Sequence, residues 1–569
     1  MKSALARTLL ATWICCALPF VSQASGRIEP ADTGDPAPAT APDEGPGDVG
    51  KPAPADGPAG MVIVTDASLV AQFRRLASTH ERLGLVTRLR TLQSIRDAYP
   101  AGRDDAERIR LFLKDARANW GIEFAFMGGD EPLIPMRRAY VDQLPPVTDP
   151  VILLPTDQYY ACLDGDWNAD GDDRWGELPN MVTGDPGDDA DVVPELCVGR
   201  APVTTRQQAQ EFVDKTVRTL ERSMSSDPLD VLLVAGAALG TTFFAPQAEA
   251  AKALIDSATA ASIARLYRYA ASWPGAEPLT EESLLAGLET GPELSVLFGS
   301  GGPGTFALEA NPPLIEVPAE DLLGLENRDS FGHAVALSAY TTQPGILSIG
   351  AALVQARRGG SASVLGPTDI EFVGVSNHYI ELYLEKGFVE HAATVGEAMR
   401  AVLHEPDLVQ PFSILRLTAL GNTLLGDPAL PFPAGTAPPA AAFAKVSASG
   451  PGAWLDAGVT TALTARRPAF SRPDAGRDRA RASARLDRAT GSLEIAFERP
   501  RSAGSLLDVS VIDLSGRRVR QLDRATARAG TGSVSWDLRD ADGRRVRPGL
   551  YFVRVATGGD QQVVRAVVW

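Results

Sequence analysis

The chain is short of cysteine and of positive charge, and each shortage excludes a class of function. Its 569 residues include only four cysteines, namely Cys15, Cys16, Cys162 and Cys197. Any chemistry carried by the part after residue 197 must therefore do without a thiol. Acidic residues outnumber basic ones, 71 to 54, the formal net charge is −17, and no basic face extends over a folded segment. A nucleic-acid partner is therefore not expected.

Long apolar runs are also missing, so we predict no transmembrane segment. The apolar stretch at residues 9–21 is too short to span a bilayer. Two basic residues precede it and small residues follow it, which is the pattern of an export signal with its cleavage site. We therefore predict a signal peptide at residues 1–24 and an exported protein, extracellular or on the cell surface. Cleavage would leave Cys162 and Cys197, and the sequence leaves open whether these two form a disulfide.

Two stretches have almost no large apolar residues and are predicted to be linkers. Residues 25–60 consist mainly of Pro, Ala, Gly and Asp, and they cannot bury enough surface to fold. Residues 435–490 are rich in Ala, Pro and Arg and are expected to be solvated. Between them we predict one α/β domain at 61–434, with halves at about 61–225 and 226–434.

Apolar segments of strand length alternate with amphipathic segments in the region between the two linkers. The predicted strands are 61–66, 85–92, 122–130, 230–237, 294–300, 333–340 and 362–368. The predicted helices are 67–84, 104–121, 246–264 and 377–387. This β-α-β rhythm predicts a doubly wound, mostly parallel sheet. Residues 491–569 instead alternate apolar and polar residues between Ser-Gly, Asp-Gly and Pro-Gly pairs, which predicts a small antiparallel β-sandwich.

The acidic stretch DWNADGDDRWGE, residues 166–177, matches the spacing of a twelve-residue calcium-binding loop. Positions 1, 3, 5, 7 and 12 carry Asp166, Asn168, Asp170, Asp172 and Glu177, and position 6 is Gly171. Oxygen ligands at alternate positions can wrap one cation, and the glycine permits the sharp turn. We predict a structural calcium ion here, with position 7 contributing its main-chain carbonyl; a solvated acidic turn is the alternative. The flanks are not helical, so this would not be an EF-hand.

Four stretches in order resemble the gingipain-type cysteine peptidase family, which has a caspase-like α/β fold. They are FMGGDEPLIP (126–135), PTDQYYACLDGDWNADGDDRWGE (155–177), CVGRAPVTTRQQAQEFVDKTV (197–217) and LGNTLLGDPALPF (420–432). The tail, through VIDLSGRRVRQL, WDLRDADGRRV and PGLYFVRV, resembles the Ig-like C-terminal domains of flagellar hook-capping proteins and of type IX secretion cargo. The second resemblance implies export or surface attachment, with the secretion machinery as a partner.

The resemblance places the family's two catalytic positions on residues that cannot perform its chemistry. A Gly-His-Gly loop of the family corresponds to Gly299-Ser300-Gly301, followed here by Gly302, and the nucleophilic cysteine corresponds to Tyr340. A serine is no base near neutral pH, and a tyrosine hydroxyl ordinarily has a pKa near 10. No catalytic residue is then intact. The resemblance therefore implies a pseudo-peptidase that keeps the fold to bind a polypeptide or cell-surface ligand.

Two other functions fit the sequence less well. An active hydrolase with a rearranged site could use Ser300, but Phe298 breaks the Gly-x-Ser-x-Gly pattern of a nucleophile elbow. It could instead use Cys162, although Asp164 and Asp166 are expected to raise the pKa of that thiol. A surface-attached adhesive protein would carry its function in the β-sandwich. His333 opens the strand that leads to Tyr340 and is expected to be structural. The remaining candidates, His378, His391 and His404, are expected at the surface or at helix ends.

Overall fold

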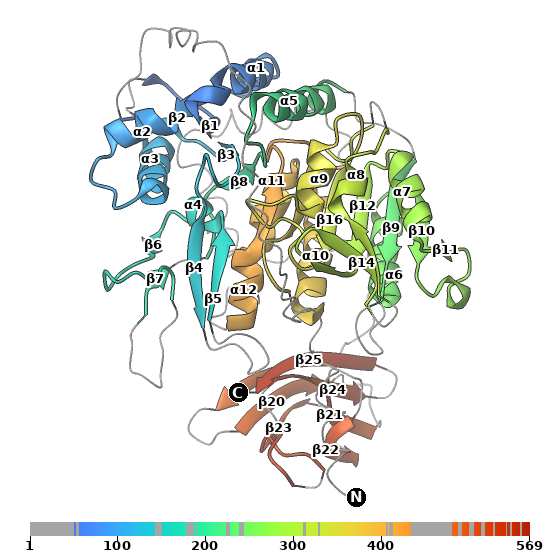
Figure 1. Ribbon diagram of the computed structural model, residues 1–569. Helices are drawn as coiled ribbons and strands as arrows, with labels where there is room; N and C mark the ends of the chain where they lie inside the picture. The colour runs from blue at the N-terminus through green and yellow to red at the C-terminus, as the bar shows by residue number, and fades with distance from the viewer. Residues whose placement is uncertain are drawn as a thin grey trace, which may run out of the picture. The chain divides into compact units, whose positions relative to one another are not determined.

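The fold is that of a computed structural model (Figure 1). It describes residues 51–433 except 53–55, 143–150, 178–186, 191, 223–227, 238–243, 311–313, 328–329, 372, 406–407 and 409–412, and residues 481–568 except 488–491, 500–505, 514–517, 527–529, 542, 547–548 and 558–559. The predicted signal peptide and most of both predicted linkers lie outside the described residues. The chain divides near residue 459 into two compact units, which are treated separately below.

One large sheet of eleven strands forms the centre of the first unit. In spatial order the strands are β2 (Thr87–Thr91), β1 (Met61–Thr65), β3 (Phe124–Gly128), β8 (Cys197–Arg200), β18 (Asn422–Leu425), β17 (Ser363–Pro367), β16 (His333–Leu337), β12 (Leu294–Phe298), β9 (Leu229–Ala235), β10 (Ala261–Tyr267) and β11 (Glu277–Pro278). All neighbouring pairs are parallel except β17 and β18. The predicted α/β fold with a mostly parallel sheet is therefore confirmed.

The two predicted halves meet at β18, the last strand of the sheet in the sequence. This strand pairs in parallel with β8 of the first half and antiparallel with β17 of the second half. Strand direction therefore reverses once, at the seam between the halves. Within the second half the carboxyl ends of β12, β16 and β17 lie along one edge, which is where α/β proteins usually build their sites.

Helices cover both faces of this sheet. They are α1 (Val70–Arg82), α2 (Leu92–Ala98), α3 (Asp105–Trp120), α4 (Gln158–Ala161), α5 (Arg206–Glu221), α6 (Ala245–Ala258), α7 (Glu281–Glu289), α8 (Ala319–Leu322), α9 (Ile349–Gln355), α10 (Val373–Phe388), α11 (Val395–Val402) and α12 (Ser413–Gly421). Alternate residues of β1 enter different cores: Ile63 packs in one apolar cluster and Val62 in another. This alternation explains why the strand reads as a continuous apolar run.

Local signals in the sequence set the helix ends. The carboxylate of Asp104 accepts a hydrogen bond from the amide of Glu107 and caps α3, which ends at Gly121 with a φ of 74°. A capping box between Thr205 and Gln208 begins α5. Helices α1 and α5 then lie side by side over the first half of the sheet (Figure 1).

The first unit also contains three small antiparallel sheets. The glycine stretch after β12 is itself a short strand, β13 (Ser300–Gly302), which pairs with β14 (Thr305–Glu309) and through it with β15 (Ile315–Pro318). The residues that correspond to the family's Gly-His-Gly loop therefore include a paired strand. In the first half, β4 (Arg137–Asp142) pairs with β5 (Val151–Thr156), and β6 (Gly165–Asp166) with β7 (Asp189–Ala190).

The second unit consists of two antiparallel sheets, as the sequence predicts. One contains β19 (Arg481–Asp487), β20 (Ser492–Arg499) and β23 (Gly530–Trp536); the other contains β22 (Arg518–Thr526), β21 (Leu506–Asp513), β24 (Gly549–Thr557) and β25 (Asp560–Val568). Ile495, Val511 and Trp536 are among the buried residues of its own apolar core. Strand β19 lies within 435–490, the range assigned to a linker, so this unit begins earlier than predicted.

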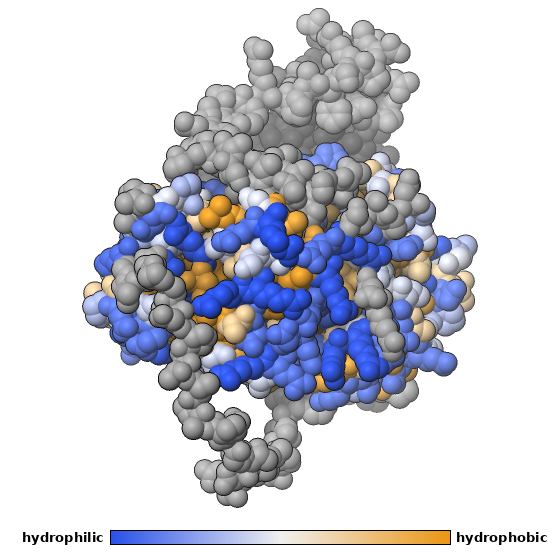
Figure 2. Space-filling model, turned by 90° about the horizontal axis from the view of Figure 1, so that it is seen from above, coloured by the Kyte–Doolittle hydropathy of each residue, from blue (hydrophilic) through white to orange (hydrophobic). Residues whose placement is uncertain are grey.

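One predicted helix is too long. The prediction of a helix over 246–264 merges α6 with the following strand, β10, because the Ala-rich stretch continues the helical spacing. The helix ends at Ala258, and Ile263 then pairs with Val231 of β9. Among the described residues every helix is too short or too polar to cross a bilayer. The face drawn in Figure 2 is mainly hydrophilic where it is coloured, with apolar side chains in small groups.

Candidate functional site

The structure brings the two predicted catalytic positions to adjacent strand ends. Strands β12 and β16 are parallel neighbours with Phe298 opposite Leu337, and Ser300 and Tyr340 follow shortly after these residues. The hydroxyl of Ser338 donates a hydrogen bond to the main-chain carbonyl of Ser300 over 2.9 Å. The two segments are therefore in direct contact at the carboxyl edge of the second half.

The glycines at this edge are needed for that close contact. A Cβ on Gly301 would lie 2.1 Å from the Ser338 hydroxyl and 2.8 Å from the carbonyl of Ala339. A Cβ on Gly299 would lie 2.6 Å from the ring of Phe306. Ser300, between these glycines, is only 5% exposed. The segment that corresponds to the family's histidine loop is therefore packed against the end of β16.

Tyr340 has a backbone conformation that residues other than glycine rarely adopt. Its φ is 60°, which is uncommon for any residue except glycine and is found most often at functional sites and turns. Its amide donates to the carbonyl of Asp369 over 3.0 Å, and its side chain is hydrogen-bonded to the Asp369 carboxyl group. Burial raises the pKa of Asp369, and the bond from Tyr340 partly opposes this shift.

Both cysteines among the described residues lie in the interior of the α/β domain. Cys162 and Cys197 form no disulfide in the structure, and they are 0% and 1% exposed. Burial raises the pKa of Cys197 to about 12. The thiolate needed for attack on a peptide carbonyl is therefore disfavoured at Cys197.

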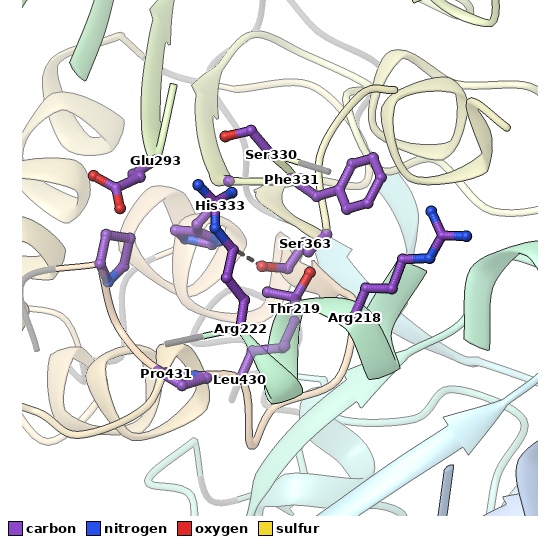
Figure 3. Close-up of a pocket in the computed structure, with 13 residues that line it drawn as sticks. Arg218, Thr219, Arg222, Glu293, Ser330, Phe331, His333, Ser363, Leu430 and Pro431 are labelled. Atoms are coloured by element: carbon purple, nitrogen blue, oxygen red, sulfur yellow. Dashed lines mark hydrogen bonds between the residues drawn. The ribbon is translucent and has the colours of Figure 1, made fainter. Parts of the chain in front are cut away.

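His333 lies at the start of β16, at the other end of the strand from the segment of Tyr340. Its ring nitrogens are 2.8 Å from the hydroxyls of Ser363 and Tyr383, and burial lowers its pKa to about 3. It lines a cavity of about 30 Å³, the space of one water molecule, together with Arg222 and Glu293 (Figure 3). The imidazole is therefore neutral at physiological pH and both of its nitrogens are hydrogen-bonded, as expected of a structural histidine.

A second buried histidine was not identified from the sequence. The Nε2 atom of His80, on α1, is 2.7 Å from the carboxylate of Asp427, and both side chains are fully buried. His80 lies within an amphipathic helix pattern, and its partner is 347 positions away in the sequence, so no local signal could have revealed this pair.

Three of the five predicted calcium ligands converge in the acidic loop. Carboxylate oxygens of Asp170, Asp172 and Glu177 all lie within 4.8 Å of one another, whereas no oxygen of Asp166 belongs to that group. The side-chain amide of Asn168 donates to the main-chain carbonyl of Asp172 over 2.5 Å. The carbonyl of Asp172 therefore contacts Asn168, while its exposed carboxylate belongs to the group of three.

A residue outside the twelve-residue pattern also holds this loop. The carboxylate of Asp188 accepts hydrogen bonds from the amides of Ala169, at 2.6 Å, and Gly176, at 2.7 Å. Burial raises the pKa of Asp188. Asp188 lies beside β7, which pairs with β6, and this pairing could not be inferred from the loop spacing.

Sequence and structure comparisons connect the chain with known proteins. A model of peptidase family C25 matches residues 54–433, and a model of the FlgD Ig-like domain matches residues 483–561. No curated protein matches the chain. A solved structure described as "Structure of Protease" is 15% identical, with a TM-score of 0.48, over 90% of this chain and 97% of that chain. The complex of Porphyromonas gingivalis RgpB pro- and mature domains is 13% identical, with a TM-score of 0.47, over 90% of this chain and 100% of that chain.

A further solved structure is similar to a small part of the chain. FlgD from P. aeruginosa is 23% identical over 15% of this chain and 67% of that chain, with a TM-score of 0.12. The family C25 model covers both halves of the large sheet, the edge that carries Ser300 and Tyr340, and the acidic loop.

Proposed function

This chain belongs to peptidase family C25, and on that premise we propose that it is an exported member without thiol peptidase activity. Its α/β domain would retain the family fold to bind a polypeptide or a cell-surface ligand. Its second unit would serve export or surface attachment, with the secretion machinery as partner. The match of that unit to the FlgD Ig-like model supports an accessory domain distinct from the α/β domain.

One observation carries the proposal: the two positions that the resemblance assigns to the catalytic pair hold Ser300 and Tyr340. Cysteine peptidase chemistry needs a thiolate as nucleophile and an imidazole within hydrogen-bond reach. The edge of β12 and β16 supplies a buried serine and a tyrosine bonded to Asp369. Loss of the nucleophile or its base typically lowers the rate by several orders of magnitude.

A serine hydrolase at the same edge is not favoured. The Ser300 backbone is paired with Ala307 in an antiparallel ladder, and the residue is 5% exposed. A nucleophile elbow instead presents its serine on a sharp turn between a strand and a helix. The strand–hairpin arrangement here supports the binding function over a rearranged hydrolase.

A peptide-substrate screen tests the proposal. We expect no cleavage above that of heat-inactivated protein for the wild type, the Cys162→Ala variant or the Ser300→Ala variant. Cleavage that is lost on alkylation and in Cys162→Ala would refute the proposal in favour of a thiol peptidase. Cleavage that survives alkylation but is lost in Ser300→Ala would instead support the rearranged hydrolase.

Deletion of the second unit tests its part of the proposal. Removal of residues 481–569 should leave the α/β domain folded, because each unit has its own apolar core. In the native host the truncated protein should accumulate in a different place from the full chain. The same location for both proteins would contradict a role of this unit in export or attachment.

A further inference from the structure

We propose that the second unit has an arginine-rich face that binds the phosphate groups of an anionic lipid surface. The face is formed by β22 and by the hairpin at residues 537–546, and its described arginines are Arg518, Arg520, Arg539, Arg544 and Arg545. The inference rests on the proposed role of this unit in surface attachment, and it names the chemistry of the surface to which the unit attaches.

Positive charge is concentrated in the second unit. Residues 481–569 contain sixteen arginines, no lysine and ten acidic residues, so their formal charge is +6, whereas residues 1–480 carry −23. The expectation that no folded segment has a basic face followed from the charge of the whole chain and does not hold for this unit. An anionic surface would therefore attract the second unit and repel the rest of the chain.

The backbone brings arginines from two parts of this unit together. The amide of Ala541 donates to the carbonyl of Val519 over 2.9 Å, which joins the hairpin to β22. Val519 is buried, so Arg518 and Arg520, one residue to either side of it in the strand, point away from the core. The guanidinium of Arg520 also donates to the carbonyl of Asp540 in the hairpin. The arginines of β22 therefore lie beside those of the hairpin.

Two arginines lie directly opposite each other within the hairpin. Arg539 and Arg545 form an antiparallel bridge, which is flanked on both sides by backbone hydrogen bonds of 2.8 Å. In this arrangement the two opposite side chains share one face and lie close together. Like charges in such positions destabilise the pairing. Both residues are exposed, so an anionic group bound between their guanidinium groups would offset this repulsion.

The acidic residues described in the hairpin do not neutralise this face. The carboxylate of Asp540 accepts a hydrogen bond from the amide of Arg544 over 2.9 Å and thereby holds the turn. Asp537 is 3.8 Å from Arg520, and its side chain is 53% exposed. Two carboxylates against five guanidinium groups leave the described part of the face positively charged.

The use of arginine alone favours phosphate as the ligand group. A guanidinium is planar and can donate two parallel hydrogen bonds to one phosphate, which an ammonium group cannot do. A lipid surface presents many phosphate groups side by side, so several arginines of one face can bind at the same time. Basic residues near an anionic membrane each add to the attraction.

Sedimentation with lipid vesicles tests the proposal on the purified full chain. We expect the protein to sediment with vesicles of equal parts phosphatidylcholine and phosphatidylglycerol, and to stay in solution with phosphatidylcholine alone. Raising the salt from about 0.1 M to about 1 M should release it, because salt screens the attraction. No sedimentation with the anionic vesicles, or equal sedimentation with both kinds, would overturn the proposal. Retention on heparin without vesicle binding would also overturn it, in favour of an acidic polysaccharide.

Matched double variants locate the face. Arg539→Gln combined with Arg545→Gln should weaken partitioning onto the anionic vesicles by roughly twentyfold, at about fivefold for each arginine. Arg74→Gln combined with Arg357→Gln makes the same change of net charge at exposed positions of the first unit, and it should leave partitioning within about twofold. Equal weakening by the two pairs would mean attraction to the overall charge of the chain and would overturn the proposal.

Two further variants separate binding from folding. Arg539→Lys combined with Arg545→Lys keeps the charge, so it should bind anionic vesicles more tightly than the glutamine pair does. Asp537→Asn removes a negative charge from the face and should strengthen binding severalfold, a result that loss of folding cannot produce. Weaker binding by Asp537→Asn would contradict the proposal.

The vesicle experiment can fail independently of the proposed attachment role. If deletion of residues 481–569 changes the location of the protein in the host but the full chain does not bind anionic vesicles, the lipid surface is refuted and the attachment role stands. If the full chain binds these vesicles but the deletion leaves the location unchanged, the attachment role is refuted and the lipid-binding face stands.

Discussion

Tyr340 is joined to Asp369 through both its backbone and its side chain. The amide of Tyr340 donates to the Asp369 carbonyl over 3.0 Å, and the Tyr340 side chain is hydrogen-bonded to the Asp369 carboxyl group. The first residue follows β16 and the second follows the neighbouring strand, β17. The position that the resemblance assigns to a nucleophile is therefore tied to the next strand end in a backbone conformation with φ of 60°.

The Tyr340→Phe variant tests the side-chain half of this link. Loss of the hydroxyl removes one hydrogen bond and should destabilise the folded protein by about 1 kcal/mol. The free energy of unfolding, measured in urea, checks this value. An unchanged free energy would mean that the bond contributes nothing in solution.

The same variant should show a specific pH dependence. Because burial raises the pKa of Asp369, the folded state binds a proton that the unfolded state has already lost in the range just above the ordinary aspartate pKa. The contribution of Asp369 to stability is therefore present at lower pH and lost as the pH rises through this window. Tyr340→Phe should enlarge that loss, because the ionised carboxylate no longer has this donor. Parallel stability curves for the two proteins would contradict the assignment.

Gly301→Ala tests how tightly the two strand ends pack. The added Cβ would lie 2.1 Å from the Ser338 hydroxyl, so the segments must separate, at a cost of about 2 kcal/mol or more. Gly302→Ala is the matched control in the same strand, because its nearest contact is the side chain of Thr305 at 3.3 Å. Thermal unfolding of both variants measures the difference. Similar melting temperatures would show that this edge is open in solution.

Lys215 lies on α5 and contacts the second half, so it tests how this helix packs there. Its buried ammonium donates to the carbonyls of Leu353, Val354 and Gly359, at distances of 3.2, 3.0 and 2.6 Å. Burial lowers its pKa to about 7. Between that value and the ordinary lysine pKa the unfolded state binds more protons, so stability should rise with pH, by up to about 1.4 kcal/mol per unit.

Replacement of that lysine gives the corresponding control. In Lys215→Met the free energy of unfolding should no longer rise with pH above about pH 7. At pH 9 the variant should be less stable than the wild type by about 1–3 kcal/mol, because the neutral amine of the wild type still donates to the carbonyls. Urea unfolding at pH 6, 8 and 9 measures both effects. If the stability of the variant still rises with pH, the pH dependence must come from another group.

The sequence predicted the elements whose signals are local. Strands such as β1 and β12 are continuous apolar runs, and α3 has both a capping carboxylate and a terminal glycine. Strand β10 was missed because the helical spacing of α6 continues into it. Strand β18 was missed because it has only four residues and pairs with strands from both halves.

The candidate site, like the fold, was predictable only in part. The alignment of two strand ends was enough to place Ser300 near Tyr340, because parallel neighbours share an edge. The positive φ of Tyr340 and its bond to Asp369 could not be predicted, since they arise from the approach of a third strand end. Asp188 was missed for a similar reason, because it reaches the acidic loop from outside the twelve-residue pattern.

The most direct test of the proposed absence of thiol peptidase activity is labelling of the folded protein with a peptide-directed thiol probe, read by intact mass. We predict no adduct on the folded protein, because the sulfurs of Cys162 and Cys197 are buried and Tyr340 occupies the position assigned to the nucleophile. Both cysteines should react only after denaturation. A stoichiometric adduct on the folded protein, together with loss of peptide cleavage, would contradict this conclusion.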